Sequence, residues 1–300
     1  MNEQFADLGE ITLCYETFGS PDDPTLLLIM GLATQMIGWD EDFCRQLAGQ
    51  GFHVVRFDNR DAGRSTHIKA RPPKIGEIVR RSKKAARYTL DDMADDAVGL
   101  LDHLGVERAH VVGASMGGMI AQTVAIRHPD RVCSLVSIMS NTGGRVSGQP
   151  AFAVYPVLFK TAPDEREAFA DHVVKTFKKI GSPGFDHDWD EVREMARLSY
   201  DRGRDPAAPG RQLAAIIASP KRAKDLRRIT APALVIHGTA DKLVRKSGGR
   251  ATARRIPGAR LMEIDGMAHD LPRDAWPQII EGIVENARRA GFGVTARTAA

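Results

Sequence analysis

A strand–turn–helix pattern at residues 109–121 constrains this chain more than any other feature. Residues 110–112 form a short β-rich run, and the next five residues, Gly-Ala-Ser-Met-Gly, fit the pattern G-x-S-x-G. Residues 119–128 suit a helix that ends before a proline. The two glycines leave room for a sharp turn that strains Ser115 and exposes its Oγ. A tight turn in an unrelated α/β protein is the alternative, but the position between strand and helix favours a catalytic serine.

Length and composition fit a large globular protein. The 300 residues, 43% of them hydrophobic, suffice for one α/β domain with an insertion or for two small domains. The longest apolar runs, such as residues 26–30, have the length of a strand and not of a membrane span. The N-terminus has no signal-peptide pattern, and the widely spaced Cys14, Cys44 and Cys133 predict reduced, mostly buried thiols in a cytoplasmic protein. The net charge of +4 is too small to indicate nucleic-acid binding, and no stable membrane insertion is expected.

Strands and helices alternate through most of the chain. Strands are expected at residues 11–18, 25–30, 53–57, 110–113, 132–139, 233–237 and 260–264, and helices at 40–50, 90–104, 245–255 and 276–289. Repeated β-α units predict an α/β fold, with a mostly parallel sheet flanked by helices on both faces. Ligands of such sheets bind beyond the carboxyl ends of the strands, which is where Ser115 would lie.

The alternation of strands and helices is interrupted between residues 141 and 228, where no strand is expected. Helix-like segments follow one another there, at residues 164–179, 190–200 and 211–218. We therefore expect residues 1–140 and 229–300 to form the α/β core and residues 141–228 to form an inserted helical cap over Ser115. A helical domain that faces elsewhere is the alternative.

A serine hydroxyl needs a base to take its proton and an acid to orient that base. His269 lies in the loop Gly-Met-Ala-His-Asp after the last expected strand, and Asp241 lies just after the strand before it. The resulting order, Ser115, Asp241, His269, is the order expected of a nucleophile, acid and base in this kind of sheet.

Other residues compete for these roles. Asp265 and Asp270 are rival acids, although their closeness in sequence to His269 makes it hard for them to reach its Nδ1 while Nε2 faces the serine. His237 precedes the predicted acid, which favours a structural role.

Two backbone N–H groups are expected to bind the negative charge of a tetrahedral intermediate. One belongs to Met116, which directly follows the serine at the start of a helix. The other belongs to Leu32, because Gly31 before it allows the backbone to turn inward. A simple turn at Gly31 is the alternative.

The chain resembles the α/β-hydrolase superfamily over nearly its whole length, and most closely the branch that contains aclacinomycin methylesterase. The motifs that carry the resemblance are Leu-Ile-Met-Gly-Leu-Ala at 28–33, Arg-Phe-Asp-Asn-Arg-Asp-Ala-Gly-Arg-Ser at 56–65, Gly-Ala-Ser-Met-Gly-Gly at 113–118 and Gly-Met-Ala-His-Asp-Leu-Pro at 266–272. In that family a Ser-Asp-His triad hydrolyses carboxylic esters beneath a helical cap, which implies these roles for Ser115, Asp241 and His269. The segment 67–87 is longer than in that methylesterase and the cap sequence gives no match, so an aromatic polyketide substrate is not implied.

Several further sequence features suit structural roles or the lining of a pocket. The basic segment 64–87 is interpreted as a solvated loop and helix face, and the cluster at 186–191 as cap surface and not as a metal site. Asn59, Arg60, Asp61 and Arg64 are expected to tie down the turn after their strand. The residues expected to line the substrate pocket, each of which also suits a core position, are Gly31, Met36, Trp39, Met119, Met139, Phe152 and Tyr155.

Together these features predict a serine hydrolase that needs no cofactor or metal and acts on small to medium acyl or alkyl esters. A thioesterase, lactonase, C–C hydrolase or perhydrolase would use the same triad, and a small-molecule receptor without turnover is the alternative outside enzymes. An aspartate-nucleophile dehalogenase or epoxide hydrolase is disfavoured because residue 115 is serine. A homodimer is left open.

Overall fold

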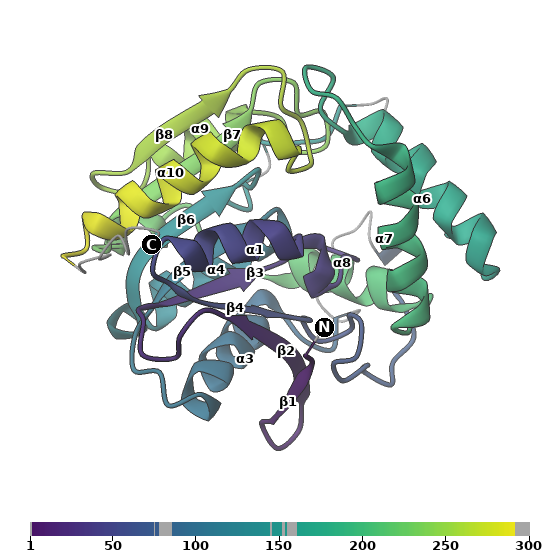
Figure 1. The fold of residues 1–300 in the computed structure, drawn as a ribbon, viewed down its shortest axis with the longest axis horizontal. Helices are drawn as coiled ribbons and strands as arrows, with labels where there is room; N and C mark the ends of the chain where they lie inside the picture. Colours follow the sequence, from purple (N-terminus) through teal and green to yellow (C-terminus); the bar gives the residue numbers. More distant parts are fainter. Residues whose placement is uncertain are drawn as a thin grey trace.

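An eight-stranded sheet forms the centre of the computed structural model, which describes residues 2–74, 76–77, 86–144, 146–151, 154 and 161–291 (Figure 1). The strands are β1 (Gln4–Asp7), β2 (Thr12–Phe18), β3 (Thr25–Ile29), β4 (His53–Phe57), β5 (Ala109–Ala114), β6 (Val132–Ile138), β7 (Ala233–Gly238) and β8 (Arg260–Ile264). Their order is β1-β2-β4-β3-β5-β6-β7-β8. Strands β3 to β8 run parallel to one another, whereas β1 and β2 form an antiparallel edge.

Helices cover both faces of this sheet. The helices are α1 (Glu41–Gly49), α3 (Leu90–His103), α4 (Met116–Arg127), α6 (Arg166–Ile180), α7 (Trp189–Asp201), α8 (Ala208–Ala218), α9 (Ser247–Ala253) and α10 (Trp276–Arg288). Short 3-10 turns are η1 (Met36–Gly38), η3 (Pro129–Arg131), η5 (Asp225–Arg228) and η6 (Arg273–Ala275). In the described part of the chain, no helix combines the length and apolar character needed to cross a membrane.

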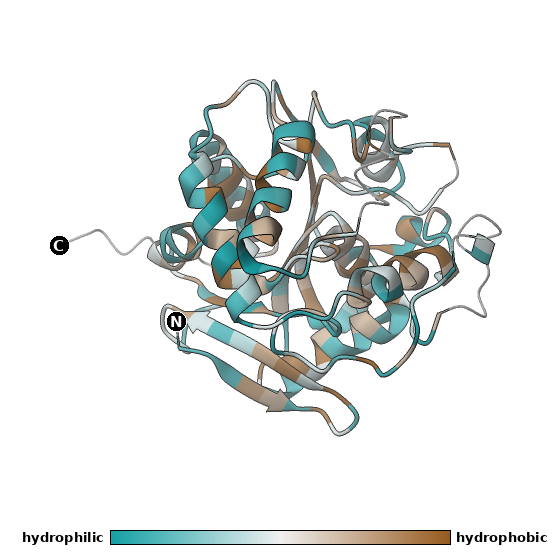
Figure 2. Ribbon diagram, turned by 90° about the vertical axis from the view of Figure 1, so that its right-hand side faces the viewer, coloured by the Kyte–Doolittle hydropathy of each residue, from teal (hydrophilic) through white to brown (hydrophobic). Residues whose placement is uncertain are grey.

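Alternation along the strands divides the core into two layers. Leu27 and Ile29 of β3 pack in the same cluster as α3 and α4, whereas Leu26 and Leu28 pack with α1 and α10 on the other face. This follows from the two-residue repeat of a strand, which sends successive side chains to opposite faces. The predicted α/β fold is confirmed, and hydrophobic residues concentrate in the strands and the helices against them (Figure 2).

Two local features differ from the sequence-based expectation. Strand β1 was not predicted, because its four residues alternate only weakly between buried and exposed positions. Helix α4 begins at Met116, three residues before the predicted start at Met119. Its first turn contains Gly117, where an added Cβ would lie 2.0 Å from the carbonyl oxygen of Ile29. Glycine therefore lets the helix begin directly against β3 and right after the serine.

The insertion between β6 and β7 carries α6, α7 and α8 (Figure 1). Helices α6 and α7 pack against each other at one side of the molecule and carry many hydrophilic residues, whereas α8 lies nearer the sheet (Figures 1 and 2). The division into a core and a cap at residues 140 and 228 stays a prediction.

All three cysteines are buried and free, as expected. Burial raises the pKa of Cys14 and of Cys44 to about 12 each, with nearby acidic groups adding to the effect. Both thiols are therefore protonated at neutral pH.

Candidate active site

Ser115 lies at the sharp turn between β5 and α4, in the strained conformation that the sequence predicts. Its φ of +55° falls in the left-handed region, which costs energy for a residue with a Cβ. The N–H of Ser115 donates to the carbonyl oxygen of Ile138, at 2.9 Å, so β6 helps to hold the turn. At Gly113 an added Cβ would lie 2.1 Å from the carbonyl oxygen of Gly117, which explains the glycine pair on either side of the serine.

The structure brings Ser115, His269 and Asp241 into one hydrogen-bonded row. Nε2 of His269 lies 2.9 Å from Oγ of Ser115, and Nδ1 of the same ring lies 2.8 Å from Oδ2 of Asp241. Both distances are those of hydrogen bonds. The three residues come from loops that follow β5, β7 and β8, at the carboxyl ends of parallel strands. A base placed in this way can take the proton of the hydroxyl while the acid holds its tautomer.

Asp241 is buried yet stays ionised. Burial by itself would raise its pKa, but His269 and His237 beside it hold the pKa of this carboxyl well below its usual range. Its Oδ1 also accepts the backbone N–H groups of Leu243 and Val244, at 2.8 and 2.9 Å. These contacts fix the carboxylate so that Oδ2 faces the imidazole.

The rival residues lie in other environments. Asp265 accepts the hydroxyl of Thr239 at 2.8 Å, on the surface. Asp270 contacts Ser182 and His187 of the connection between α6 and α7. His237 is fully buried, and its Nε2 donates to the carbonyl oxygen of Val244 at 2.7 Å while lying 3.5 Å from Asp241. His237 thus supports the acid, a contact that its sequence position did not indicate.

The loop after β3 lies against the serine. At Gly31 an added Cβ would be 3.1 Å from the Cβ of Ser115, so a larger residue would crowd the nucleophile. Ala33 has a φ of +60°, and its N–H donates to Oε1 of Gln212 at 2.8 Å. Among the described residues we find no acceptor for the N–H of Leu32. Met116 is the first residue of α4, so its N–H has no acceptor within the helix.

Gln212 is a residue that sequence reasoning missed. It lies on α8 and is fully buried, and its Nε2 donates to the carbonyl oxygen of Arg60 at 3.0 Å. Its two hydrogen bonds join the inserted helices to the loop that carries Leu32 and to the turn after β4. Nothing in the local sequence marks this glutamine, because its partners lie more than 150 residues away.

The residues expected to line a pocket lie in different places. Met36 is fully buried beside Cys14, and Trp39 is fully buried and stacked on Phe43. Met119 and Met139 are also buried in the core clusters. Phe152 and Tyr155 lie outside the described residues. The role of this set in binding a substrate stays a prediction.

The turn after β4 is tied down by ionic contacts, as expected. Arg60 pairs with Asp96, and Asp61 accepts the hydroxyl of Tyr88 and pairs with Arg211. Potential ligand atoms of Asp61, His67 and Asp205 lie within 4.8 Å of one another. The guanidinium of Arg211 contacts both carboxylates and supplies the positive charge there.

In the described part of the basic segment 64–87, two arginines pair with acids. Arg64 pairs with Glu3 and Arg71 with Glu77, so part of the positive charge is balanced.

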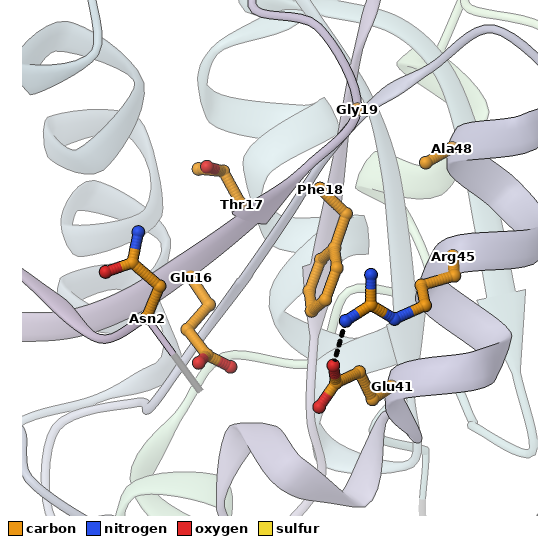
Figure 3. A pocket seen from close by; sticks show the side chains of 8 residues that line it. All are labelled: Asn2, Glu16, Thr17, Phe18, Gly19, Glu41, Arg45 and Ala48. Atoms are coloured by element: carbon orange, nitrogen blue, oxygen red, sulfur yellow. Dashed lines mark hydrogen bonds and ion pairs between the residues drawn. The ribbon is translucent and has the colours of Figure 1, made fainter.

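A separate cleft of about 570 Å³ opens elsewhere on the surface (Figure 3). Strand β2 and helix α1 supply most of its lining, with Phe18 beside the Glu41–Arg45 ion pair. No predicted site residue lines this cleft.

Comparisons with known proteins relate the chain to hydrolases over most of its length. The sequence pattern of a family described as alpha/beta hydrolase fold matches residues 24–272. Rhodomycin D methylesterase DauP of Streptomyces sp. (strain C5) is 30% identical, over 94% of this chain and 96% of that protein. 3-Oxoadipate enol-lactonase 2 of Acinetobacter baylyi is 26% identical over 92% of each. A solved hydrolase structure from Pseudomonas aeruginosa PA01 matches with a TM-score of 0.71 and 26% identity, over 96% of this chain and 98% of that one.

Proposed function

The chain belongs to the alpha/beta hydrolase fold family, and we propose that it hydrolyses carboxylic esters with Ser115 as nucleophile, His269 as base and Asp241 as the acid that orients the base. The resemblance stated from the sequence motifs is confirmed, and the chain is an esterase-type hydrolase. The observation that carries the proposal is the pair of hydrogen bonds at His269, 2.9 Å to the serine and 2.8 Å to the aspartate.

In the first half of the reaction, Oγ of Ser115 attacks the ester carbonyl carbon while Nε2 of His269 takes the hydroxyl proton. The carbonyl oxygen becomes negatively charged. The N–H groups of Leu32 and Met116 receive this charge, and the dipole of α4 adds to the attraction at Met116. The intermediate then breaks its bond to the alcohol, which leaves with the proton from His269.

In the second half, water attacks the acyl group on Ser115, and His269 takes a proton from this water. The second intermediate collapses, the acid leaves, and the serine regains its proton from His269. Asp241 stays ionised throughout and stabilises the imidazolium that forms in each half. We propose that helices α6, α7 and α8 form a cap over the site, which limits the access of water to the acyl group.

The names of the relatives point to alkyl esters and lactones as candidate substrate classes. One relative is named a methylesterase and another an enol-lactonase, and a lactone is an internal ester cleaved by the same steps. We propose small to medium acyl or alkyl esters as the principal class and lactones as the second candidate.

Replacing the nucleophile tests the proposal. We expect Ser115→Ala to fold normally and to lower kcat by at least about 10³-fold, because the covalent intermediate cannot form. Turnover is measured on a panel of methyl esters, p-nitrophenyl esters of rising acyl length, and lactones. A fluorophosphonate should label the unmodified protein at Ser115 and leave the variant unlabelled.

Two outcomes would contradict the proposal. Near-normal turnover by Ser115→Ala would mean that another nucleophile operates. Saturable binding of esters without any product, in the unmodified protein, would indicate a receptor and not an enzyme.

A further inference from the structure

The connection between α6 and α7 lies directly against the loop that carries His269. The backbone N–H of His269 donates to the carbonyl oxygen of Ile180, at 3.0 Å. The N–H of Gly184 donates to the carbonyl oxygen of Gly266, at 3.1 Å. An added Cβ at Gly184 would lie 2.6 Å from the Cα of Gly266, so the two backbones approach as closely as glycine permits.

One hydroxyl at this contact bridges the two neighbours of His269. Oγ of Ser182 accepts the backbone N–H of Ala268 at 2.7 Å and donates to Oδ1 of Asp270. Ser182 is 1% exposed, so water does not compete for these bonds. The residue before the histidine and the residue after it are therefore fixed by the same side chain.

The second oxygen of Asp270 is also used by the α6–α7 connection. Oδ2 lies 2.7 Å from Nε2 of His187, and the ring of His187 stacks on Trp189 with 4.8 Å between centroids. Both oxygens of Asp270, a rival acid in the sequence, are thus used by the α6–α7 connection, whereas Nδ1 of His269 bonds to Asp241.

We propose that Ser182 is a positioning residue, which holds the loop of His269 so that the imidazole reaches Ser115 and Asp241 together. The inference rests on the proposed function, because the position of His269 matters to turnover only if it is the base. In this proposal the inserted segment both covers the active site and holds the loop of His269 in its catalytic position.

Contacts on the core side keep the histidine loop folded without Ser182. The N–H of Ala240 donates to the carbonyl oxygen of Met267, and the indole of Trp276 donates to that of Leu271, both at 2.9 Å. Loss of the Ser182 hydroxyl would therefore shift the loop and not unfold it. A misplacement of about 1 Å at a reacting group can lower the rate by roughly 10²-fold.

The test compares Ser182→Ala, which removes the hydroxyl, with Ser182→Thr, which keeps it. Ser219→Ala is the matched control, because Ser219 also accepts one backbone N–H, from Leu90 at 2.8 Å, and donates to one carbonyl oxygen, of Ala215 at 2.6 Å. The readouts are kcat and KM on an ester that the unmodified protein hydrolyses, the rate of fluorophosphonate labelling, and the melting temperature.

We expect Ser182→Ala to lower kcat and the labelling rate by roughly 10- to 100-fold, with KM changed by less than about threefold. Ser182→Thr should recover most of the kcat. Ser219→Ala should keep the kcat of the unmodified protein at a similar drop in melting temperature.

An unchanged kcat in Ser182→Ala, or an equal loss in Ser219→Ala, would overturn the proposal. If Ser182→Ala fails to fold, Ser182→Cys takes its place, since a thiol fills a similar space but is only a weak hydrogen-bond donor and acceptor for Asp270 and Ala268. A lower kcat at constant KM then supports the positioning role, and an unchanged kcat overturns it. Absence of labelling at Ser115 in the unmodified protein would instead overturn the proposed function itself.

Discussion

One buried histidine, His110, predicts that the stability of this protein depends on pH. His110 on β5 is 1% exposed, and its Nδ1 lies 2.9 Å from Oγ of Ser134. Burial lowers the pKa of His110 to about 4, with a smaller contribution from Arg108. In the unfolded chain the pKa is about 6.5. The unfolded state therefore binds a proton before the folded state does, and stability is lost as the pH falls from about 6.5 toward 4.

This predicts the behaviour of His110→Gln, which is neutral at every pH. Between about pH 7.5 and pH 5, the free energy of unfolding of the unmodified protein should fall by about 2 kcal/mol more than that of the variant. Urea unfolding at the two pH values measures the difference. Parallel losses in both proteins would show that His110 does not take up the proton on unfolding.

Sequence order was sufficient to nominate the three residues that meet at the site. Ser115 was marked by its glycines, and Asp241 and His269 by their places after successive strands. Parallel strands end at one edge of the sheet, so loops far apart in sequence converge there. Contacts made by Ser182, His237 and Gln212 were not predicted, because each depends on how the loops and inserted helices pack and not on a local pattern.

At the scale of elements, helix α8 holds the loop after β3 through Gln212. The fully buried amide accepts the N–H of Ala33, whose φ of +60° is strained, and donates to the carbonyl oxygen of Arg60. Ala33 follows Leu32, the proposed donor to the developing oxyanion. Through this contact, helix α8 helps to set the direction of the neighbouring Leu32 N–H, which lies in the loop after β3.

Replacing Gln212 tests this influence. Gln212→Leu keeps the volume but removes two hydrogen bonds of a fully buried amide, to the N–H of Ala33 and to the carbonyl oxygen of Arg60, so we expect a loss of about 1–3 kcal/mol in unfolding free energy. We also expect kcat to fall roughly tenfold with little change in KM, because the loop shifts near the charge that forms in the transition state. Steady-state kinetics and urea unfolding measure the two effects.

Asn286→Leu is the matched control for this prediction. Asn286 on α10 is 2% exposed, and its Nδ2 donates to the carbonyl oxygens of Leu135 and Pro232. It should lose stability without a loss of kcat. Equal falls in kcat for the two variants would mean that lower stability alone, and not the loop, accounts for the effect.

Elements with a clear apolar pattern in the sequence were predicted well, whereas β1 and the start of α4 were not. Strands β3 to β7 were visible in the sequence because both their faces are buried. The edge strand β1 has only one buried residue and left no such signal. The early start of α4 was missed because its first turn contains two glycines, which disfavour helices; Gly117 is required by the close approach to β3, and Gly118 lies against Ser140.

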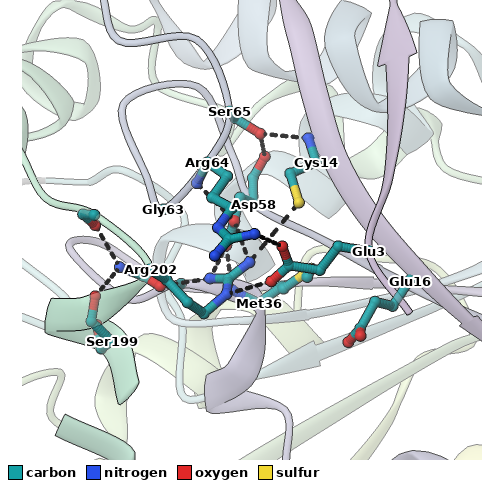
Figure 4. Close-up of polar contacts among 12 residues, drawn as sticks. Glu3, Cys14, Glu16, Met36, Asp58, Gly63, Arg64, Ser65, Ser199 and Arg202 are labelled. Carbon is teal, nitrogen blue, oxygen red and sulfur yellow. Dashed lines mark hydrogen bonds and ion pairs between the residues drawn. The ribbon is translucent and has the colours of Figure 1, made fainter. Parts of the chain in front are cut away.

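At the scale of the whole molecule, one buried arginine joins three distant parts of the chain (Figure 4). Arg202, at the end of α7, is 4% exposed and pairs with Asp58 after β4 at 2.8 Å and with Glu3 near the N-terminus at 2.7 Å. It also donates to the side chain of Gln35. Burial opposes the charge of Arg202, but the hydrogen bonds to Asp58 and Glu3 raise its pKa above the usual range.

This contact predicts that the end of α7 is fixed to the core and does not open as a lid. Arg202→Met should lower the free energy of unfolding by about 3–5 kcal/mol, because Asp58 would remain buried without its partner. Hydrogen exchange should become faster in α7 and in β1 together, since both lose the same anchor. The exposed pair of Arg166 and Asp201 on α6 and α7 is the control, and Arg166→Met should change neither quantity appreciably.

A second variant separates the arginine's charge from its packing. In Arg202→Met combined with Asp58→Asn, the uncompensated carboxylate is removed, so part of the lost stability should return. If the double variant is no more stable than Arg202→Met, the buried charge of Asp58 is not what makes the single change costly. If exchange in α7 stays slow in Arg202→Met, other contacts fix this helix, and Arg202 is not the anchor between the inserted helices and the sheet.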